Sequence, residues 1–341
     1  MVVGIHSAGS LTPTFTSFEN ICTILFRQTL NCAVPLFLAI SGYFIGAKEI
    51  SWGKKHISFL KKQIPKVYIP TLILSLPFLV FSLISGENGY LKPLVNYFAC
   101  GFGVFYFIAL IIQYYLLLPI FIRLNNFGGI ILTSMISILS VLVGIEYLSN
   151  FQGMQLPLLI YAAPFPLWII FFFMGIYFSK HSRDYKIILP LGLIVIGVVL
   201  QIFEYKFWMN REVFALGQTL ASFIFSAGVI WFFFSKKAES TYSLFTKNII
   251  VNIVNWIGGI SFGIYLLHFY MVLAAHHLFP NFNWIETWTL VLCITILLIW
   301  IVKSLLPNFS VRYLGFRWEL VGFTYFYAKN FGTVNFVELK I

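Results

Sequence analysis

The sequence predicts an all-α fold, a polytopic transmembrane helix bundle of about ten spans with the first truncated at its N-terminus. Hydrophobic residues make up 60% of the 341 positions, and charged residues make up only 10%. The mean hydropathy is +0.90, whereas a soluble domain is about one quarter charged. Apolar runs long enough to cross a bilayer recur along the chain, so we expect an integral membrane protein.

Nine segments are apolar over the roughly 19 residues that a membrane-spanning helix requires. They lie at 22–46, 67–85, 102–122, 130–148, 160–179, 187–204, 213–234, 250–275 and 287–305. A tenth apolar stretch, residues 1–5, leads directly into His6. Five residues cannot cross about 30 Å of hydrocarbon at 1.5 Å per residue. The stretch also lacks the basic start and the cleavage site of a signal peptide. We therefore expect the end of a first helix whose beginning is missing.

The distribution of basic residues predicts the orientation. If His6 lies at the outer end of the first helix, the inner segments carry 18 of the 22 Lys and Arg residues. The outer loops carry only Lys92, Lys206 and Arg211, and Arg27 lies within a span. Basic residues collect on the cytoplasmic side of membrane proteins. We expect one transmembrane domain, 1–305, followed by an aromatic and basic cytoplasmic-side tail, 306–341, along the inner surface.

Several classes of function are poorly supported. The net charge of +11 comes from short loops between apolar runs, with no arginine-rich stripe of the kind that binds nucleic acid. The four cysteines show no C-x-x-C spacing, which favours packing over redox or zinc chemistry. No two carboxylates share a span, which argues against a proton pump or a glycosidase-like pair. The chain lacks a phosphate-binding loop of the G-x-x-x-x-G-K-[ST] type, and this excludes an ATPase. Residues 259–263 read GISFG, but a nucleophile elbow needs a strand before the serine, and this string lies within a span.

Two basic side chains near the outer side are candidates for chemistry. His6 is either an interfacial histidine or a general base, because an imidazole can accept a proton from a hydroxyl group at neutral pH. Arg27 lies about one and a half turns into its span. It either extends its guanidinium group to the interface or faces a polar cavity, where it would bind an anionic or carbonyl group.

His268 shares one helical face with Tyr265 and Ser261, which precede it by three and seven residues. It is either a packing histidine with satisfied hydrogen bonds or part of a site. His276 and His277 do not have the spacing of zinc ligands, so we expect no metal site. On the inner side, a group of lysines serves topology and could also attract a phosphate-rich ligand. These lysines are Lys61, Lys62 and Lys66.

Together, five strings resemble acyltransferase family 3, the integral-membrane O-acyltransferases that modify bacterial surface sugars. MVVGIHS places His6 at the family's catalytic histidine. AVPLFLAISGYFIG, which contains Ser41, is similar to the second-helix signature. FLKKQIPKVYIP is similar to the basic start of the third helix. VFYFIALIIQYYLLLP resembles the fourth helix, with Tyr106 where the family has tryptophan, and ISFGIYLLH resembles the late helix that ends in histidine.

Two departures from the family pattern stand out. The family's first helix carries an arginine eleven residues before the histidine, and that position would precede Met1. Members also have an arginine four residues before the VP proline, where this chain has Asn31. Whether Arg27 compensates for either arginine is left open by the sequence.

The resemblance implies an O-acyltransferase of a bacterial inner (plasma) membrane. It would move an acyl group, usually acetyl, from cytoplasmic acyl-CoA to a hydroxyl of a cell-surface or lipid-linked sugar. His6 would be catalytic, and no cofactor would be permanently bound, since acetyl-CoA is a co-substrate. Donor and acceptor would be bound by Arg27, Ser41, Lys61, Lys62, Lys66, Tyr106, Tyr265 and His268. The alternative is a polytopic transporter or lipid flippase, which a buried Arg and His permit but which the lack of internal symmetry disfavours.

Overall fold

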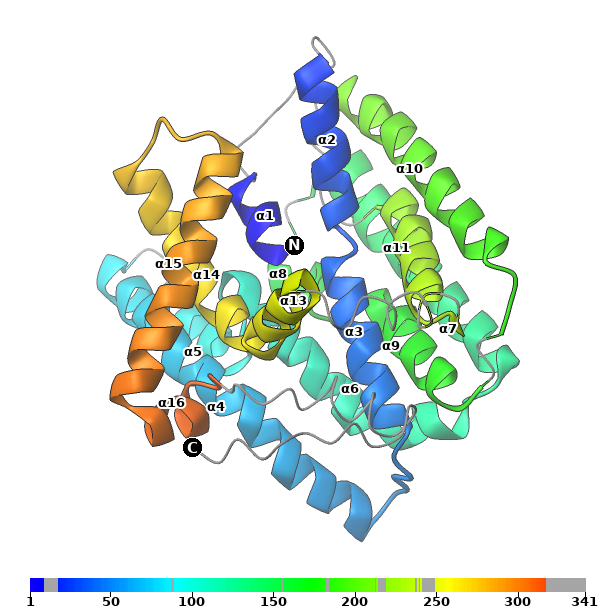
Figure 1. Cartoon of the computed structure of the whole chain (residues 1–341), viewed down its shortest axis with the longest axis horizontal. Helices are drawn as coiled ribbons and strands as arrows, with labels where there is room; N and C mark the ends of the chain where they lie inside the picture. The colour runs from blue at the N-terminus through cyan, green and yellow to red at the C-terminus, as the bar shows by residue number, and fades with distance from the viewer. Residues whose placement is uncertain are drawn as a thin grey trace.

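The structure is a computed structural model of the whole chain, and every regular element among the described residues is helical (Figure 1). The described residues are 1–8, 18–86, 89–154, 156–181, 184–211, 213, 219–236, 238, 240 and 249–316. Most of the predicted tail, 317–341, lies outside them, although α16 packs its beginning against α15 and α4.

The described residues form helical elements in the following order. In the first part of the chain they are α1 (Val2–Ser7), α2 (Phe18–Leu30), α3 (Ala33–Gly46), α4 (Lys54–Ser85), α5 (Leu91–Phe98), η1 (Gly103–Phe105), α6 (Tyr106–Arg123), α7 (Phe127–Ser140) and the π-helix η2 (Val141–Phe151). In the second part they are α8 (Leu158–Tyr161), α9 (Phe165–Lys180), α10 (Ile188–Met209), α11 (Leu220–Phe233), α13 (Ile249–Gly259), α14 (Ser261–Leu278), α15 (Trp284–Leu305) and α16 (Pro307–Tyr313).

Seven helical segments of the described chain are long and apolar enough to cross a membrane. The predicted spans at 160–179 and 213–234 correspond to the shorter apolar helices α9 and α11. The predicted span at 250–275 divides at Ile260 into α13 and α14, and the one at 22–46 turns at Asn31 between α2 and α3. The all-helical, multi-span architecture is thus confirmed, whereas the count of about ten spans is not.

Helix α4 extends well beyond the predicted span at 67–85, because the basic segment before that span continues the same helix. Its 32 residues measure roughly 48 Å at 1.5 Å per residue, which exceeds the hydrocarbon thickness of about 30 Å. The helix ends at Gly86, whose φ of 67° is the left-handed conformation that glycine adopts without strain. The lysine-rich first part of α4 therefore projects past the apolar part of the bundle (Figure 1).

Helices α3 and α9 make the closest crossing in the bundle. A Cβ atom on Gly175 would lie 1.9 Å from the carbonyl oxygen of Ala39, and one on Gly42 would lie 2.1 Å from the carbonyl oxygen of Phe172. The absence of side chains at these positions lets the two backbones touch, as small residues do in membrane bundles. This crossing fixes the position of α3 in the middle of the molecule (Figure 1).

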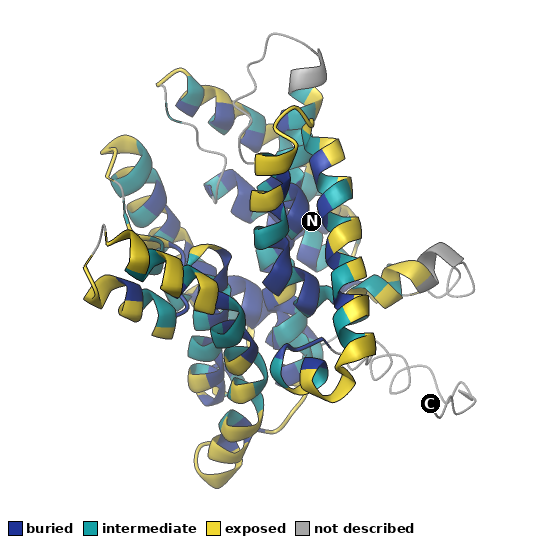
Figure 2. Ribbon diagram, turned by 90° about the vertical axis from the view of Figure 1, so that its left-hand side faces the viewer, coloured by how far each residue is buried: buried dark blue, intermediate teal, exposed yellow. Residues whose placement is uncertain are grey.

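The core consists of two main apolar clusters. One joins α3, α6, α9 and α11 and includes a run of fully buried aromatic residues, Phe171 to Phe173. The other joins α1, α14 and α15. Figure 2 shows the buried residues along the inside of the bundle and the exposed ones on its outer faces. Many of the exposed residues are large and apolar, for example Phe81 at 74% and Ile84 at 80%, which suits contact with lipid.

The α3–α9 crossing supplies a stability test. Gly175→Ala would place a methyl group against a backbone carbonyl that cannot rotate away, and overpacking of this kind costs about 1–3 kcal/mol. We expect the melting temperature of the purified protein in detergent to fall. The matched control is Gly192→Ala in α10, where nothing lies within 4 Å of the added Cβ. Equal melting temperatures for the two variants would contradict the close crossing.

Candidate active site

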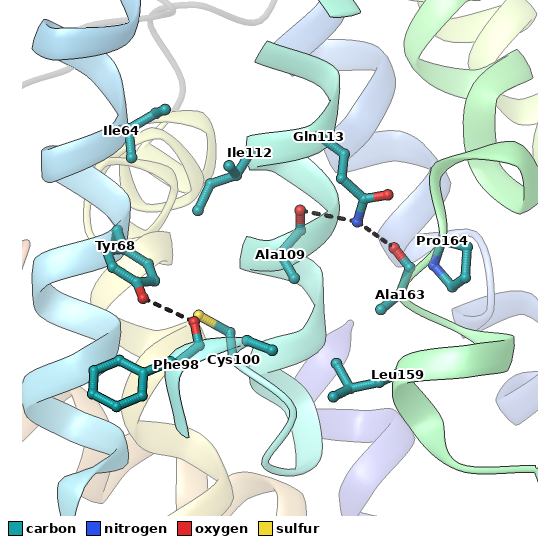
Figure 3. Close-up of a pocket in the computed structure, with 11 residues that line it drawn as sticks. Ile64, Tyr68, Phe98, Cys100, Ala109, Ile112, Gln113, Leu159, Ala163 and Pro164 are labelled. Atoms are coloured by element: carbon teal, nitrogen blue, oxygen red, sulfur yellow. Dashed lines mark hydrogen bonds between the residues drawn. The ribbon is translucent and has the colours of Figure 1, made fainter. Parts of the chain in front are cut away.

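Helices α4 and α6 line two cavities among the described residues. The larger, of about 560 Å³, is lined by α4, α6, the end of α5 and the segment before α9 (Figure 3). Its polar groups are already bonded to the backbone. The Tyr68 hydroxyl donates to the carbonyl of Phe98 at 2.8 Å, and Gln113 Nε2 donates to the carbonyl of Ala163 at 2.8 Å. This cavity offers an apolar surface rather than reactive groups.

The smaller cavity, of about 180 Å³, is lined by more polar side chains. Its walls come from α1, α3, α4, η1, α6 and α14. Its apolar lining belongs to the α3–α6–α9–α11 cluster and to a smaller cluster that joins α4, η1, α6 and α14. Its polar side chains are those of His6, Ser41, Tyr106, Tyr115, Ser261 and Tyr265. Four of these six were candidates from the sequence, and they come from four different helices. Such a pocket between helices, largely apolar with a few convergent polar groups, is typical of a small-molecule site.

The register of α3 explains its contribution to the cavity wall. Val34, Phe37 and Ser41 line the cavity, and their spacing of three and four residues puts them on one face of the helix. Gly42 follows at about 100° around the axis and faces α9 instead. The α3–α9 contact therefore turns Ser41 toward the cavity.

Two imidazole rings meet beside this cavity. The ring centroids of His6 and His268 are 5.3 Å apart, with the planes tilted by 42°. His6 lies on α1, which is packed among α2, α14 and α15, while His268 is fully buried in α14. The Phe269 ring meets the His6 ring edge-on at 5.9 Å. Residues separated by 262 positions thus form one pair of potential proton acceptors.

The hydrogen bonds of His268 define its tautomer. Its Nδ1 atom lies 2.6 Å from the carbonyl oxygen of Tyr265 and 3.2 Å from that of Ile264. Because a carbonyl oxygen can only accept, Nδ1 carries the hydrogen in these contacts. In the neutral ring, Nε2 then bears a lone pair, and this atom is buried with no hydrogen-bond partner in the described part of the chain. His268 therefore holds an unused acceptor next to His6.

The tyrosines of the cavity differ in what they can donate. The Tyr265 hydroxyl donates to the carbonyl of Val104 at 2.6 Å, which ties α14 to η1. Its proton is thus already engaged. Tyr106 lines the same cavity at the start of α6, where the resemblance had placed it at the family's tryptophan position.

Arg27 does not line the cavity, but its guanidinium group is close enough to interact electrostatically with His6. It lies in the last turn of α2 and is half-buried. Its Nε and Nη1 atoms are buried and have no hydrogen-bond partner among the described residues. The predicted choice between a guanidinium group at the interface and one facing a polar cavity remains a prediction.

The three lysines lie on α4, before the part of the helix that reaches the cavity, and they do not line it. Lys61 and Lys62 are exposed, and Lys66 is half-buried directly before the cavity residue Val67. The start of α4 is anchored by His56, which is 4% exposed and whose Nε2 atom lies 2.9 Å from the carbonyl oxygen of Tyr115 on α6. The basic surface is therefore held in a fixed relation to the cavity wall.

A comparison with known protein families identifies the family of this chain. The family model described as an acyltransferase domain, that of acyltransferase family 3, matches residues 1–303. The chain belongs to acyltransferase family 3. No curated protein and no solved structure matches it. As a member of an acyltransferase family with several long apolar helices, it is a multi-pass membrane acyltransferase.

The structure of this acyltransferase also brings together residues that the sequence did not pair. Glu146 of η2 and Glu204 of α10 lie on different spans, and both carboxylates reach the start of α11. They accept the backbone N–H groups of Leu220 and Ala221 at 3.3 and 3.2 Å. The sequence could not pair these two carboxylates, because they belong to different spans. Negative groups stabilise a helix N-terminus, so their position assigns them to capping α11.

The sequence could indicate one further residue of the cavity but not two others. Ser261 was on the face of Tyr265 and His268, and it does line the cavity. His56 and Tyr115 gave no signal, because their contact joins residues 59 positions apart. In the described part of the acyltransferase, no three His, Cys, Asp or Glu side chains are grouped as a metal site would require.

The Tyr265 hydrogen bond can be tested by its removal. Tyr265→Phe leaves the Val104 carbonyl without its donor while retaining the ring, and the expected cost is about 1 kcal/mol. The melting temperature of the purified protein should fall by a few degrees. Tyr90→Phe is the control, because Tyr90 is 77% exposed. An unchanged melting temperature for Tyr265→Phe would show that this bond does not hold α14 to η1.

Proposed function

We propose that this acyltransferase moves an acyl group, acetyl first, from cytoplasmic acyl-CoA to a hydroxyl of a cell-surface or lipid-linked sugar in a bacterial inner membrane. The observation that carries the proposal is the His6–His268 pair beside one cavity, in a chain of acyltransferase family 3. An acyl transfer to a hydroxyl requires a base that removes the hydroxyl proton, and a neutral imidazole is suited to this at neutral pH.

In the proposed reaction, His6 accepts the proton of the sugar hydroxyl while its oxygen attacks the thioester carbonyl carbon. The new C–O bond forms, the C–S bond breaks, and the leaving CoA sulfur takes the proton from His6. His268 Nε2, an acceptor with no partner among the described residues, would receive the other N–H of the His6 ring and orient it. This division of roles follows the logic of a base held in place by a second group.

The negative charge on the thioester oxygen needs hydrogen-bond donors during the attack. Ser41 and Tyr106 are the candidates, since both line the cavity with His6. Tyr265 is less suited to this role because its hydroxyl proton is engaged by Val104. Tyr265 would instead hold the wall that carries His268.

The donor would approach from the side of the lysines. CoA carries several phosphate charges, and the exposed Lys61 and Lys62 with the adjacent Lys66 give a cationic surface on α4. Val67, one residue beyond Lys66, lines the cavity. Only the thioester end would need to enter the cavity, so the charged part of CoA could stay outside the hydrocarbon.

The central test is His6→Ala in purified protein supplied with radiolabelled acetyl-CoA and membranes containing surface glycan. Loss of a general base costs about 100-fold or more in rate. We expect labelled acetyl on the glycan to disappear while the protein stays in the membrane. His277→Ala is the matched control, because His277 is an exposed histidine of the same helix as His268. Full activity of His6→Ala would remove His6 from the mechanism, and net uptake of label without acylation would favour a transporter.

A second test addresses the donor side. The double variant Lys61→Gln and Lys62→Gln should raise KM for acetyl-CoA by about two- to thirtyfold with kcat unchanged, since each exposed ion pair is worth about 0.2–1 kcal/mol. The difference should shrink as salt screens the charges. Lys92→Gln, which lies outside the inner lysine group, is the control. A KM that does not respond to the double variant would place CoA elsewhere.

A further inference from the structure

Helices α2 and α10 enclose a group of buried polar side chains next to the site. Ile24 of α2 and Tyr205 of α10 pack together with exposed fractions of 1% and 2%. One turn further along each helix lie Gln28, 3% exposed, and Gln201, 2% exposed. In the predicted orientation the two helices run antiparallel. Gln28 and Gln201 therefore lie at the same depth along the α2–α10 interface.

Arg27 of α2, the residue before Gln28, and Gln201 of α10 have donors that no described residue accepts. The Nε and Nη1 atoms of Arg27 and the Nε2 atom of Gln201 are buried without a hydrogen-bond partner. Arg27 interacts electrostatically with Tyr205, which places its guanidinium group in the same interface. A guanidinium group has only donors, and a buried one without an acceptor is costly. An oxygen-rich, negatively charged ligand would accept hydrogen bonds from all three of these nitrogen atoms.

The location of the group connects it to the reaction. Arg27 also interacts electrostatically with His6, so an anion bound by Arg27 would lie beside the proposed base. Arg27 lies in the part of its span nearer the outer end, whereas the lysine surface of α4 lies on the inner side. The ligand is therefore expected from the outer side, where the acceptor would arrive.

We propose that Arg27 and Gln201 form an oxyanion-binding subsite between α2 and α10, which holds a carboxylate or phosphate group of the acceptor. Naming the ligand as the acceptor rests on the proposed acyl transfer, but the binding of an oxyanion does not. The planar guanidinium fork would bind two oxygens through Nε and Nη1, and the Gln201 amide would donate to a third contact. An acidic or phosphorylated sugar is then the preferred acceptor, and a neutral sugar is a poor one.

The subsite is tested by ligand-induced thermal stabilisation of the full-length protein in phosphatidylcholine nanodiscs. The probes are methyl β-D-glucuronide for a carboxylate, glucose 1-phosphate for a phosphate, and methyl β-D-glucoside as the neutral sugar. We expect at least one charged probe to raise the melting temperature and the neutral probe to leave it unchanged. Which charged probe acts distinguishes a uronic acid from a phosphorylated acceptor. If neither charged probe exceeds the neutral one, the proposal is overturned.

Variants assign the effect to Arg27. Arg27→Met should abolish stabilisation by the charged probes, and Arg27→Lys should weaken it about tenfold or more, because the bidentate fork is lost. Arg211→Gln is the control, since the Arg211 guanidinium stacks on Phe207 at 3.8 Å at the exposed end of α10. Gln201→Leu, which removes the amide donor, should also weaken the response.

The ligand-free melting temperature gives a second, independent outcome. Removing an unmatched buried charge relieves a cost, so Arg27→Met without ligand should melt at the wild-type temperature or above it. If Arg27 served as a structural ion-pair partner, the same variant would melt well below wild type, which would overturn the subsite. Both readouts are independent of acyl transfer, so failure of the proposed enzyme activity would leave the binding result interpretable.

Discussion

The contact between α3 and α9 is the constraint on which the rest of the structure depends. Gly42 and Gly175 let the two backbones meet, and no side chain of any size could be accommodated at either position without displacing a helix. Since α3 is fixed on one face by α9, its other face carries Val34, Phe37 and Ser41 to the cavity. A displacement of α3 would move this wall away from α1 and α14, which carry the two histidines.

The cavity lies where two separately packed parts of the bundle meet. The α3–α6–α9–α11 cluster and the smaller cluster of α4, η1, α6 and α14 supply its apolar walls, and α1 brings His6 to it. The proposed reaction requires such a cavity, because the charged parts of an acyl-CoA donor and of an acidic acceptor cannot enter hydrocarbon cheaply. A small cavity between spans admits only the reacting groups. In the proposed reaction, the lysines of α4 would hold the charged part of the donor outside the cavity, and Arg27 would hold an anionic group of the acceptor near His6.

The sequence predicted what periodicity and composition determine, and it could not predict which helices are neighbours. Helical register placed Ser261, Tyr265 and His268 on one face, and the structure agrees for all three. His6 and His268 were each singled out, yet nothing in the spacing of two distant residues could show that their rings meet. The break at Ile260 was also missed, because an apolar run looks the same whether its helix is continuous or divided.

Few buried polar side-chain atoms of the described residues lack a hydrogen-bond partner, and most of these belong to α1, α2, α10 and α14. Most buried hydroxyls of the described spans, such as those of Thr71, Thr133 and Thr295, donate to a carbonyl one turn earlier in their own helix. Such bonds need no partner helix and carry no functional meaning. The unpartnered atoms of Arg27 and His268 belong instead to two side chains that both interact with His6. A buried polar atom without a hydrogen-bond partner destabilises the folded protein, unless a bound ligand or substrate supplies the missing partner.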